Sequence, residues 1–252
     1  MVAFEALQAQ FADTSRAEVA YEVTQPLNLY DSPALEALAT QAQAGRQLQF
    51  KAVDALDKTA ALSVVLCEDD YSGWVNPVDL ECLQPATAVY SPPSLTLPEI
   101  QTRIPLAIAF AQAAMTQPNF YLWGGTLGPN YDCSGLVQHA FSAQGIWLPR
   151  DAYQQEAFVE RLDFVERLKY GGTRPEDLVN VLKPGDLIFF GTPVKATHVA
   201  IYLGNGAYIH SSGKDQGRNG IGIDSLVDHS EQVSRNYYGQ VRGAGRVVGS
   251  YA

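Results

Sequence analysis

The sequence is poor in the residues that build disulfide frameworks and nucleic-acid surfaces. Its 252 residues include only three cysteines, and an odd, small number of cysteines does not make a disulfide framework. Lysine and arginine number 17 against 27 aspartates and glutamates, for a net charge of −10. An acidic chain of this kind is a poor partner for nucleic acid or for an anionic membrane surface.

Long apolar runs are absent too. No stretch reaches the roughly 18 consecutive apolar residues that a membrane-spanning helix requires. The first residues hold no basic segment followed by an apolar one, which is the signature of a secretory signal. We therefore expect a protein that works in the cytoplasm without a membrane partner. A hydrophobic content of 46% with 17% charged residues is typical of a folded globular protein.

The residue pattern divides the chain into four segments. Residues 1–20 form a polar, alanine-rich lead with the composition of a short helix. Residues 21–88 contain several short alternating runs separated by turns, which predict a small β-barrel, with one helix-like stretch at 35–44. Residues 89–98 are a proline-rich linker. Residues 99–252 form the second domain.

The second domain changes from helical to strand periodicity along its length. Its apolar residues first fall at helical spacing, which predicts helices over 104–115, 133–143 and 153–170. Apolar and alternating runs then predict strands over 186–190, 198–203, 207–210 and 239–249. Helices followed by an antiparallel sheet indicate the α+β class.

Cys133 is the first candidate for chemistry, in the segment YDCSGLV at 131–137. It stands at the glycine-flanked start of a predicted helix. The thiolate is the nucleophilic form of cysteine, and both a helix N-terminus and a nearby imidazolium lower a thiol pKa. A cysteine at a helix start is more often structural, but the polar neighbours Asp132 and Ser134 argue against a purely buried role.

Two downstream histidines, His198 and His210, favour catalysis. They lie in consecutive predicted strands joined by a turn at 204–206. A three-residue loop would place Ala200 opposite His210 and make His198 its diagonal neighbour on the same face. A two-residue Asn-Gly loop would put the histidines on opposite faces. In the first register, His198 would serve as base to the thiol and His210 would fix its tautomer.

A metal site is the competing interpretation of the same residues. Cys133, His198 and His210 could supply three zinc ligands, but no Cys-x-x-Cys or His-Glu-x-x-His motif accompanies them. We therefore expect neither a metal nor a cofactor. His139 is off-phase with Cys133 on the predicted helix and should be a surface or packing residue, whereas His229 lies in a polar loop and should be solvated.

Arg150 and Asp151 immediately precede a predicted helix. One interpretation makes Asp151 the N-cap of that helix. The alternative is a charged pair that grips a zwitterionic ligand, with the arginine taking a carboxylate and the aspartate an ammonium. The local sequence leaves both interpretations open. In the barrel, Tyr71 is placed where it could face a partner domain.

Six segments, in order, resemble the NlpC-type branch of the papain-like cysteine peptidases. They are YLWGG at 121–125, DCSGLV at 132–137, LPR at 148–150, PGDLIFF at 184–190, HVAIY at 198–202 and YIH at 208–210. Residues 21–88 resemble a bacterial SH3-like domain around GWV at 73–75. The resemblance implies a papain-like peptidase domain, with helices packed on an antiparallel sheet, after a small SH3-like β-barrel.

The same resemblance implies hydrolysis of cell-wall peptides at a γ-D-glutamyl bond. Cys133 would attack the carbonyl, His198 would act as base and then acid, and His210 would orient it. The pairing with an SH3-like domain is similar to the cyanobacterial γ-D-glutamyl-L-diamino acid endopeptidases. Those enzymes take small muropeptides such as L-Ala-γ-D-Glu-diaminopimelate with a free N-terminal L-Ala, in peptidoglycan recycling.

That narrower resemblance also implies a set of substrate-binding residues. Ser134 and Arg150 would hold the D-Glu part, and Asp151 and Tyr71 would bind the L-Ala ammonium. Asp132 would also be a substrate-binding residue. The SH3-like domain would wall off one end of the groove.

Three alternatives remain: a wall-directed hydrolase, a papain-like acyltransferase and a non-catalytic binding module. The spacing from Cys133 to His198 is longer than a minimal family member needs, and the excess falls within 156–180 as a lid or a decoration.

Overall fold

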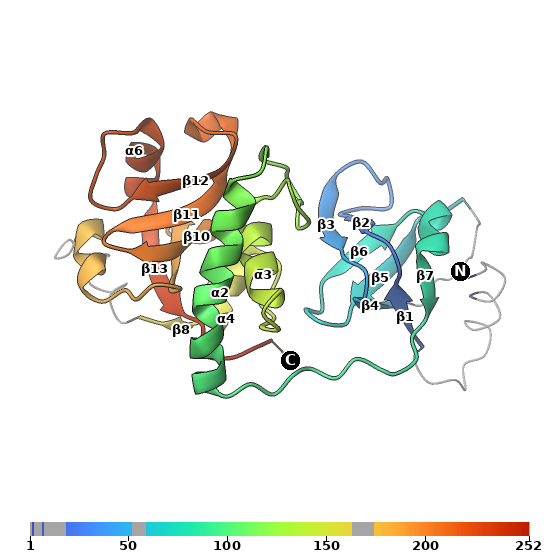
Figure 1. Ribbon diagram of the computed structural model, residues 1–252. Helices are drawn as coiled ribbons and strands as arrows, with labels where there is room; N and C mark the ends of the chain where they lie inside the picture. The colour runs from blue at the N-terminus through green and yellow to red at the C-terminus, as the bar shows by residue number, and fades with distance from the viewer. Residues whose placement is uncertain (1, 3–6, 8–18, 52–58, 163–173, 252) are drawn as a thin grey trace.

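The computed structural model describes residues 2, 7, 19–51, 59–162 and 174–251. Two parts lie side by side in Figure 1, an all-strand part at the N-terminal end and a part with helices on a sheet at the C-terminal end. The predicted N-terminal lead falls almost entirely outside the described residues, as does 163–173. Among the described residues, no helix has the length and hydropathy needed to cross a membrane.

The N-terminal part is one antiparallel sheet of seven strands in the order β3-β2-β6-β5-β4-β1-β7. The strands are β1 (Ala20–Val23), β2 (Leu27–Tyr30), β3 (Leu38–Ala42), β4 (Gln47–Phe50), β5 (Leu62–Leu66), β6 (Ser72–Val75) and β7 (Leu83–Pro85), with a 3-10 turn, η1 (Pro77–Cys82), before the last. Alternate residues such as Leu27 and Leu29 are buried on one face, as the period of two requires. No pairing among the described residues joins β3 to β7, so the predicted barrel is not closed by hydrogen bonds.

The helix-like interpretation of residues 35–44 is wrong. Residues Leu38–Ala42 form strand β3, which pairs with β2. Thr40 and Ala42 are both fully buried while their neighbours are partly exposed, so burial follows the strand period. Alanine favours a helix and threonine favours a strand, so the local preferences conflict and the tertiary contact decides the conformation.

The C-terminal part is α+β, as predicted, with helices packed on an antiparallel sheet in the order β12-β11-β10-β9-β13-β8. Its strands are β8 (Glu160–Arg161), β9 (Leu187–Gly191), β10 (Ala196–Gly204), β11 (Ala207–Ser212), β12 (Gly220–Ser225) and β13 (Val241–Arg246). Its helices are α2 (Leu97–Met115), α3 (Cys133–Ser142), α4 (Ala152–Phe158) and α6 (Gln232–Tyr238), with 3-10 turns η2 (Pro175–Asn180) and η3 (Lys214–Gln216).

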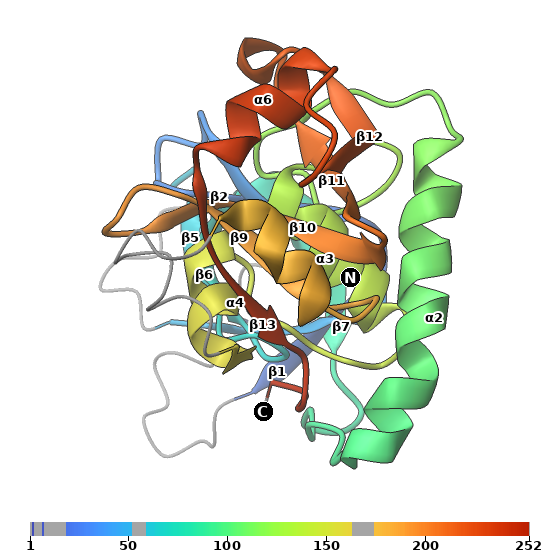
Figure 2. The ribbon, with the colours of Figure 1, turned by 90° about the vertical axis from the view of Figure 1, so that its left-hand side faces the viewer.

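The sheet is buried on both faces, which explains the continuous apolar run in β9. Leu187 and Phe189 join the core beneath α2 and α3. Ile188 and Phe190 join a second core with α6 on the opposite face. Figure 2 shows α2 and α3 to one side of the strands and α6 across another part of them. A strand covered on both faces is expected to lose the polar alternation of a half-exposed strand.

Two predicted helix boundaries differ from the structure. Helix α2 begins at Leu97 rather than near residue 104, because Thr96 and Glu99 form a capping box in which Glu99 accepts a 2.7 Å hydrogen bond from the Thr96 backbone. The helix predicted over 153–170 ends at Phe158. Val159 is extended, and Arg161 pairs with Gly245 of β13, so sheet pairing overrides helix periodicity here.

The two parts are docked through buried polar contacts as well as the linker. Gln138 of α3 donates a 2.7 Å hydrogen bond to Asp69 of the N-terminal part. Asp69 and Glu68 also pair with Arg46, whose guanidinium lies 4.7 Å from the ring centre of Trp147. These charges are buried and mutually satisfied, so separating the two parts would expose a network that is complete only when they are docked.

Candidate active site

Cys133 is the first residue of α3, and Asp132 is the N-cap of that helix. The Asp132 carboxylate accepts a 2.7 Å hydrogen bond from the backbone N–H of Gly135, which satisfies one of the free donors of the helix start. A Cβ on Gly135 would lie 2.1 Å from the carbonyl oxygen of Gly125. Only glycine allows the start of α3 to come this close to Gly125. The close approach places Cys133 at the edge of a cleft.

Burial governs the thiol. Cys133 is only 5% exposed, and burial, followed by the negative charge of Asp132, raises its pKa to about 12. The backbone N–H groups of Val199 and Ser134 act in the opposite direction and are outweighed. The lowered pKa expected from the helix start is therefore not found, since desolvation of the charged form dominates. The resting side chain is a neutral thiol.

Behind the cysteine, three buried side chains form a hydrogen-bonded chain. Nε2 of His198 lies 2.7 Å from Nδ1 of His210, and Nε2 of His210 lies 2.8 Å from Oδ2 of Asp224. Arg218 and Ser234 donate to the same carboxylate at 2.8 and 3.1 Å. His210 and Asp224 are completely buried. Such a chain holds each ring in one orientation.

The hairpin that brings the histidines together combines the two alternatives left open by the sequence. The turn is a two-residue Asn205-Gly206 loop, with both residues in the left-handed region and Gly204 opposite Ala207. An irregularity at Leu203 then shifts the register, and Ile201 pairs with Ile209. Beyond this bulge the register is that of a three-residue loop, so the two histidines share a face.

The carboxylate at the end of the chain determines where the protons lie. Burial raises the pKa of Asp224, but the hydrogen bond and charge of His210 outweigh it and hold the pKa below the usual range. Burial outweighs Asp224 and lowers the pKa of His210, so His210 is neutral in the free site and donates its Nε2–H to the ionised carboxylate. Nδ1 of His210 then has a lone pair and accepts from Nε2–H of His198, which leaves the lone pair of His198 on Nδ1. Burial, followed by the charge of His210, lowers the pKa of His198 well below 6.5, so this base is neutral.

Asp224 and Tyr237 were not identified from the sequence. The ring of Tyr237 stacks on His198 with centroids 4.3 Å apart, and its hydroxyl lies 3.4 Å from Nδ1 of His198 and 3.0 Å from the Ser212 hydroxyl. Asp224 belongs to β12, where it pairs with Tyr208, two residues from His210. Recognising residues 220–225 as the strand beside β11 would have placed Asp224 next to His210.

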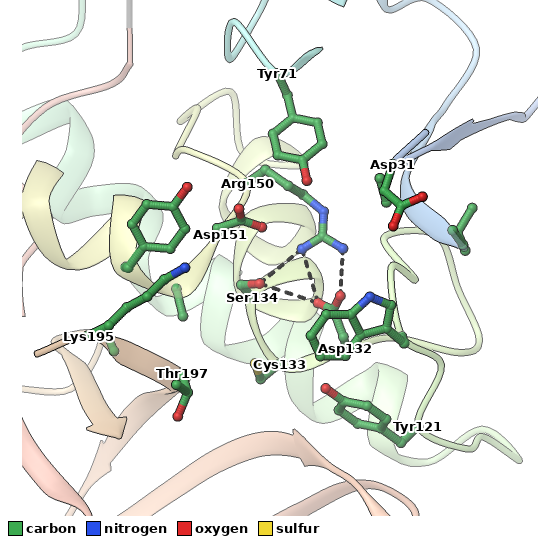
Figure 3. A pocket seen from close by; sticks show the side chains of 16 residues that line it. Asp31, Tyr71, Tyr121, Asp132, Cys133, Ser134, Arg150, Asp151, Lys195 and Thr197 are labelled. Atoms are coloured by element: carbon green, nitrogen blue, oxygen red, sulfur yellow. Dashed lines mark hydrogen bonds and ion pairs between the residues drawn. The ribbon is translucent and has the colours of Figure 1, made fainter. Parts of the chain in front are cut away.

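A cleft of about 370 Å³ opens in front of Cys133, between the two parts of the chain (Figure 3). All five predicted substrate-binding residues line it: Tyr71, Asp132, Ser134, Arg150 and Asp151. His198 instead lines a neighbouring cleft of about 290 Å³ that shares Tyr121, Trp123 and Thr197 with the first. His210 lines neither of these two clefts. In the described part of the chain, no hydrogen bond joins the thiol to His198.

Arg150 is a buried structural cation as well as a cleft residue. It is 1% exposed and holds Asp132 through a bidentate ion pair at 3.1 and 2.6 Å. It also donates to Ser134 at 2.9 Å and to Thr40 of the N-terminal part at 2.9 Å. Asp132 is therefore saturated with donors and acts as a helix cap and counter-ion. Its predicted part in substrate binding stays a prediction.

Lys195 is a second cation of the same cleft. Its ammonium lies 3.8 Å from the ring centre of Tyr153. Within the described ranges it has no carboxylate within salt-bridge distance. The positive charge of Arg150 is neutralised by Asp132, whereas that of Lys195 is open to an anionic group of a ligand.

Replacing Arg150 by methionine is expected to destabilise the fold strongly. The change leaves the buried Asp132 carboxylate without its cation, a loss of about 3–5 kcal/mol in the free energy of unfolding. Urea denaturation measures it, and Lys195→Met is the matched control with little expected effect. A loss below about 1 kcal/mol would mean that the backbone donors of Gly124 and Gly135 suffice to hold Asp132.

Asp151 is a helix N-cap, and it also lies at the cleft where the ligand-binding interpretation needs it. It is the N-cap of α4, within a capping box in which its backbone N–H donates to Gln154 at 3.0 Å. It also lines the cleft, and burial raises its pKa. Across the cleft, burial and the charge of Asp151 raise the pKa of Tyr71 to about 12. Asp31 also lines the cleft and lies on the other side of Arg150 from Asp151 (Figure 3).

The remaining histidines lie outside this arrangement. His139 faces Tyr131, whose hydroxyl is 3.0 Å from its Nδ1. His229 contacts the carbonyl of Leu226 at 3.1 Å and the ring of Tyr238, so it is packed rather than freely solvated. Within the described residues, no group of three or more histidine, cysteine or acidic side chains is arranged to hold a metal ion.

Comparisons with known proteins agree with this architecture. Residues 118–242 match the NlpC/P60 family, and residues 29–80 match the bacterial dipeptidyl-peptidase Sh3 domain. The chain is 39% identical over 105 residues to Probable endopeptidase Rv2190c of Mycobacterium tuberculosis, covering 41% of this chain and 23% of that protein. It is 33% identical over 106 residues to Probable endopeptidase p60 of Listeria monocytogenes, covering 42% and 18%. It thus spans less than a quarter of the length of these curated relatives.

A crystal structure of an NlpC/P60 family protein from Bacillus cereus aligns with 95% of this chain and 66% of its own, with a TM-score of 0.45 and 23% sequence identity. A cysteine at a helix start, packed against a sheet that supplies two histidines, defines the class as a cysteine-peptidase fold. Residues 118–242 are an NlpC/P60 domain, and residues 29–80 are a bacterial SH3-like domain.

Proposed function

We propose that the protein is a cysteine endopeptidase that cleaves the γ-D-glutamyl bond to a diamino acid in free muropeptides with an unblocked N-terminal L-Ala. The observation that carries the proposal is the position of Cys133. It stands at a helix start facing a cleft, with the buried chain of His198, His210 and Asp224 behind it. Nucleophile, base and orienting group are the components that covalent peptide hydrolysis needs.

The neutral resting groups indicate how the thiol is activated. The pKa of Cys133 is raised and that of His198 is lowered, both mainly by burial. These directions favour a neutral thiol and a neutral imidazole in the free site over a thiolate–imidazolium ion pair. His198 accepts the thiol proton at Nδ1 as Cys133 attacks the carbonyl, and Asp224 stabilises the resulting imidazolium through His210. The same proton then passes to the leaving amine, and water resolves the thioester in a second step with His198 again as base.

Two donors are available for the oxyanion that forms on the attacked carbonyl. The backbone N–H of Cys133 belongs to the first turn of α3, where amides lack intrahelical partners. Tyr121 lines both clefts, and burial, with the charge of Cys133 second, raises the pKa of its hydroxyl. The hydroxyl therefore stays protonated and can donate to an oxyanion.

The charges of the first cleft fit an L-Ala-γ-D-Glu unit. Ser134, Arg150 and Lys195 line this cleft together with Cys133 and offer donors for the free carboxylate of D-Glu, and the charge of Lys195 also acts on Asp151. At the far end, Asp151 faces Tyr71 of the N-terminal domain, which closes this end of the cleft. A free ammonium fits a carboxylate at a closed end, whereas an acetylated or glycan-linked terminus would leave Asp151 unpaired. Small free muropeptides of the cytoplasm meet this requirement.

The amine requirement is tested with L-Ala-γ-D-Glu-diaminopimelate carrying a free or an acetylated N-terminus. We expect kcat/KM to be at least about 10²-fold higher for the free peptide, because a buried polar site rejects the analogue that cannot pair with it. Asp151→Asn keeps a good N-cap and removes the charge, so it should lower cleavage of the free peptide by about 10- to 100-fold.

The exposed Asp228, which lines neither cleft, provides the control Asp228→Asn with unchanged rates. Equal cleavage of both peptides would contradict the amine requirement and favour a wall-directed hydrolase. Absence of cleavage of either peptide, with transfer to an added acceptor amine, would favour an acyltransferase.

A further inference from the structure

The second cleft lies on the other side of the reacting pair. Both clefts share Tyr121, Trp123 and Thr197, but Cys133 lines only the first and His198 lines only the second. Trp123 is 72% exposed and lines both clefts. A peptide that runs from one cleft to the other therefore passes between the thiol and the imidazole.

The position of the base assigns a direction to that peptide. The thiol forms its bond with the acyl side, and the imidazole delivers its proton to the amine side. The acyl part consequently belongs in the cleft of Cys133. The amine that leaves belongs in the cleft of His198, which has about 290 Å³ of space.

Asp215 is the charged group of this second cleft. The other polar side chains that line it, including Thr197, Gln216 and Gln240, are neutral, and burial keeps His198 neutral as well. The Asp215 carboxylate is exposed and accepts one hydrogen bond, from Gln216 at 3.0 Å. Its charge contributes to raising the pKa of Tyr237, after burial and Cys133. Asp215 therefore acts at short range from the ring that stacks on His198.

We propose that this cleft binds the diamino acid released by cleavage and that Asp215 pairs with its distal ammonium. The inference rests on the proposed function and deepens it, because it assigns the preference for a diamino acid to one residue. A carboxylate at the wall of a small cleft favours an amino acid with a terminal ammonium over one with an apolar end.

A matched pair of substrates tests the assignment. L-Ala-γ-D-Glu-L-Lys and L-Ala-γ-D-Glu-L-norleucine differ only in the terminal ammonium of the last residue. We expect the protein to cleave the lysine peptide about five- to tenfold faster in kcat/KM, since Asp215 is exposed and its ion pair is partly screened. Asp215→Asn should remove this preference by slowing cleavage of the lysine peptide alone, whereas Asp228→Asn should leave it intact.

L-Ala-γ-D-Glu-p-nitroanilide, which has no diamino acid, separates the possible failures. Asp215→Asn should hydrolyse it at the unchanged rate. Equal cleavage of the lysine and norleucine peptides, with active anilide hydrolysis, would overturn the role of Asp215 and leave the proposed function standing. An equal loss on all three substrates would show that Asp215 acts through Tyr237 and His198, which also overturns the inference. Inactivity of the unaltered protein on all three would overturn both proposals.

Discussion

Cys133→Ala is expected to abolish cleavage of L-Ala-γ-D-Glu-diaminopimelate while leaving the fold and the first cleft in place. Without the nucleophile no thioester can form, and loss of a nucleophile in a comparable triad lowers kcat by about 10⁶-fold. The residual rate should fall below detection in an assay that follows release of the free diamino acid. The side chain is small and buried beside a cleft, so its truncation costs little packing.

A binding measurement and a control variant test whether the loss of cleavage comes from the missing thiol alone. The variant should still bind the peptide, because Arg150, Lys195 and Asp151 are unchanged, and isothermal titration calorimetry measures that binding. Cys67→Ala is the matched control, since Cys67 is a free, half-buried cysteine of the N-terminal domain. Cleavage by Cys133→Ala within tenfold of the unaltered protein would rule out the thiol as nucleophile.

Asp224→Asn is expected to lower kcat by about 10²- to 10⁴-fold with little change in KM. The carboxylate stabilises the imidazolium that His198 becomes during proton transfer, and its counterpart in a serine-protease triad has an effect of this order. Ser234→Ala is the control, since it removes one donor to Asp224 and keeps the charge. We expect it to change kcat by less than about tenfold.

The pH profile distinguishes this positioning role from a loss of structure. Burial lowers the pKa of His210, whereas the hydrogen bond and charge of Asp224 raise it. Removing that charge therefore lowers the pKa of His210 further, and that of His198 through their hydrogen bond. Catalysis requires the neutral base, so activity is lost as pH falls through its pKa, and the acid limb of kcat/KM should move to lower pH in Asp224→Asn. A reduced kcat with an unmoved acid limb would contradict the positioning role.

The fold class and the reacting residues could be predicted from the sequence because their signals are local. Cys133 lies between the capping residue Asp132 and Gly135, which the start of its helix requires. Both are within two residues of Cys133 in the chain. His198 and His210 lie twelve residues apart in one hairpin. The hairpin, however, satisfies the functional register through a bulge at Leu203, which turn residues alone do not reveal.

Residues whose partners lie far away in the chain were assigned wrongly or were missed. Ala42 and Thr40 have conflicting local preferences, and their strand forms because Ala42 is buried in the N-terminal core and Thr40 is buried against Arg150 of the peptidase domain. The ion pair of Asp132 with Arg150, eighteen residues away, was also missed. Asp224 becomes part of the site only because β12 pairs with β11.

By itself, the sequence determined the two-part organisation, the helix start that presents Cys133 and the pair of histidines on one hairpin. Periodicity, capping residues and turn residues encode such features within a few positions of each other. Only the tertiary structure decided the protonation of the site, because burial raises the pKa of Cys133 and lowers that of His198. It also decided the two clefts, since their walls join Tyr71 to Asp151 and Tyr121 to Asp215 across long stretches of chain.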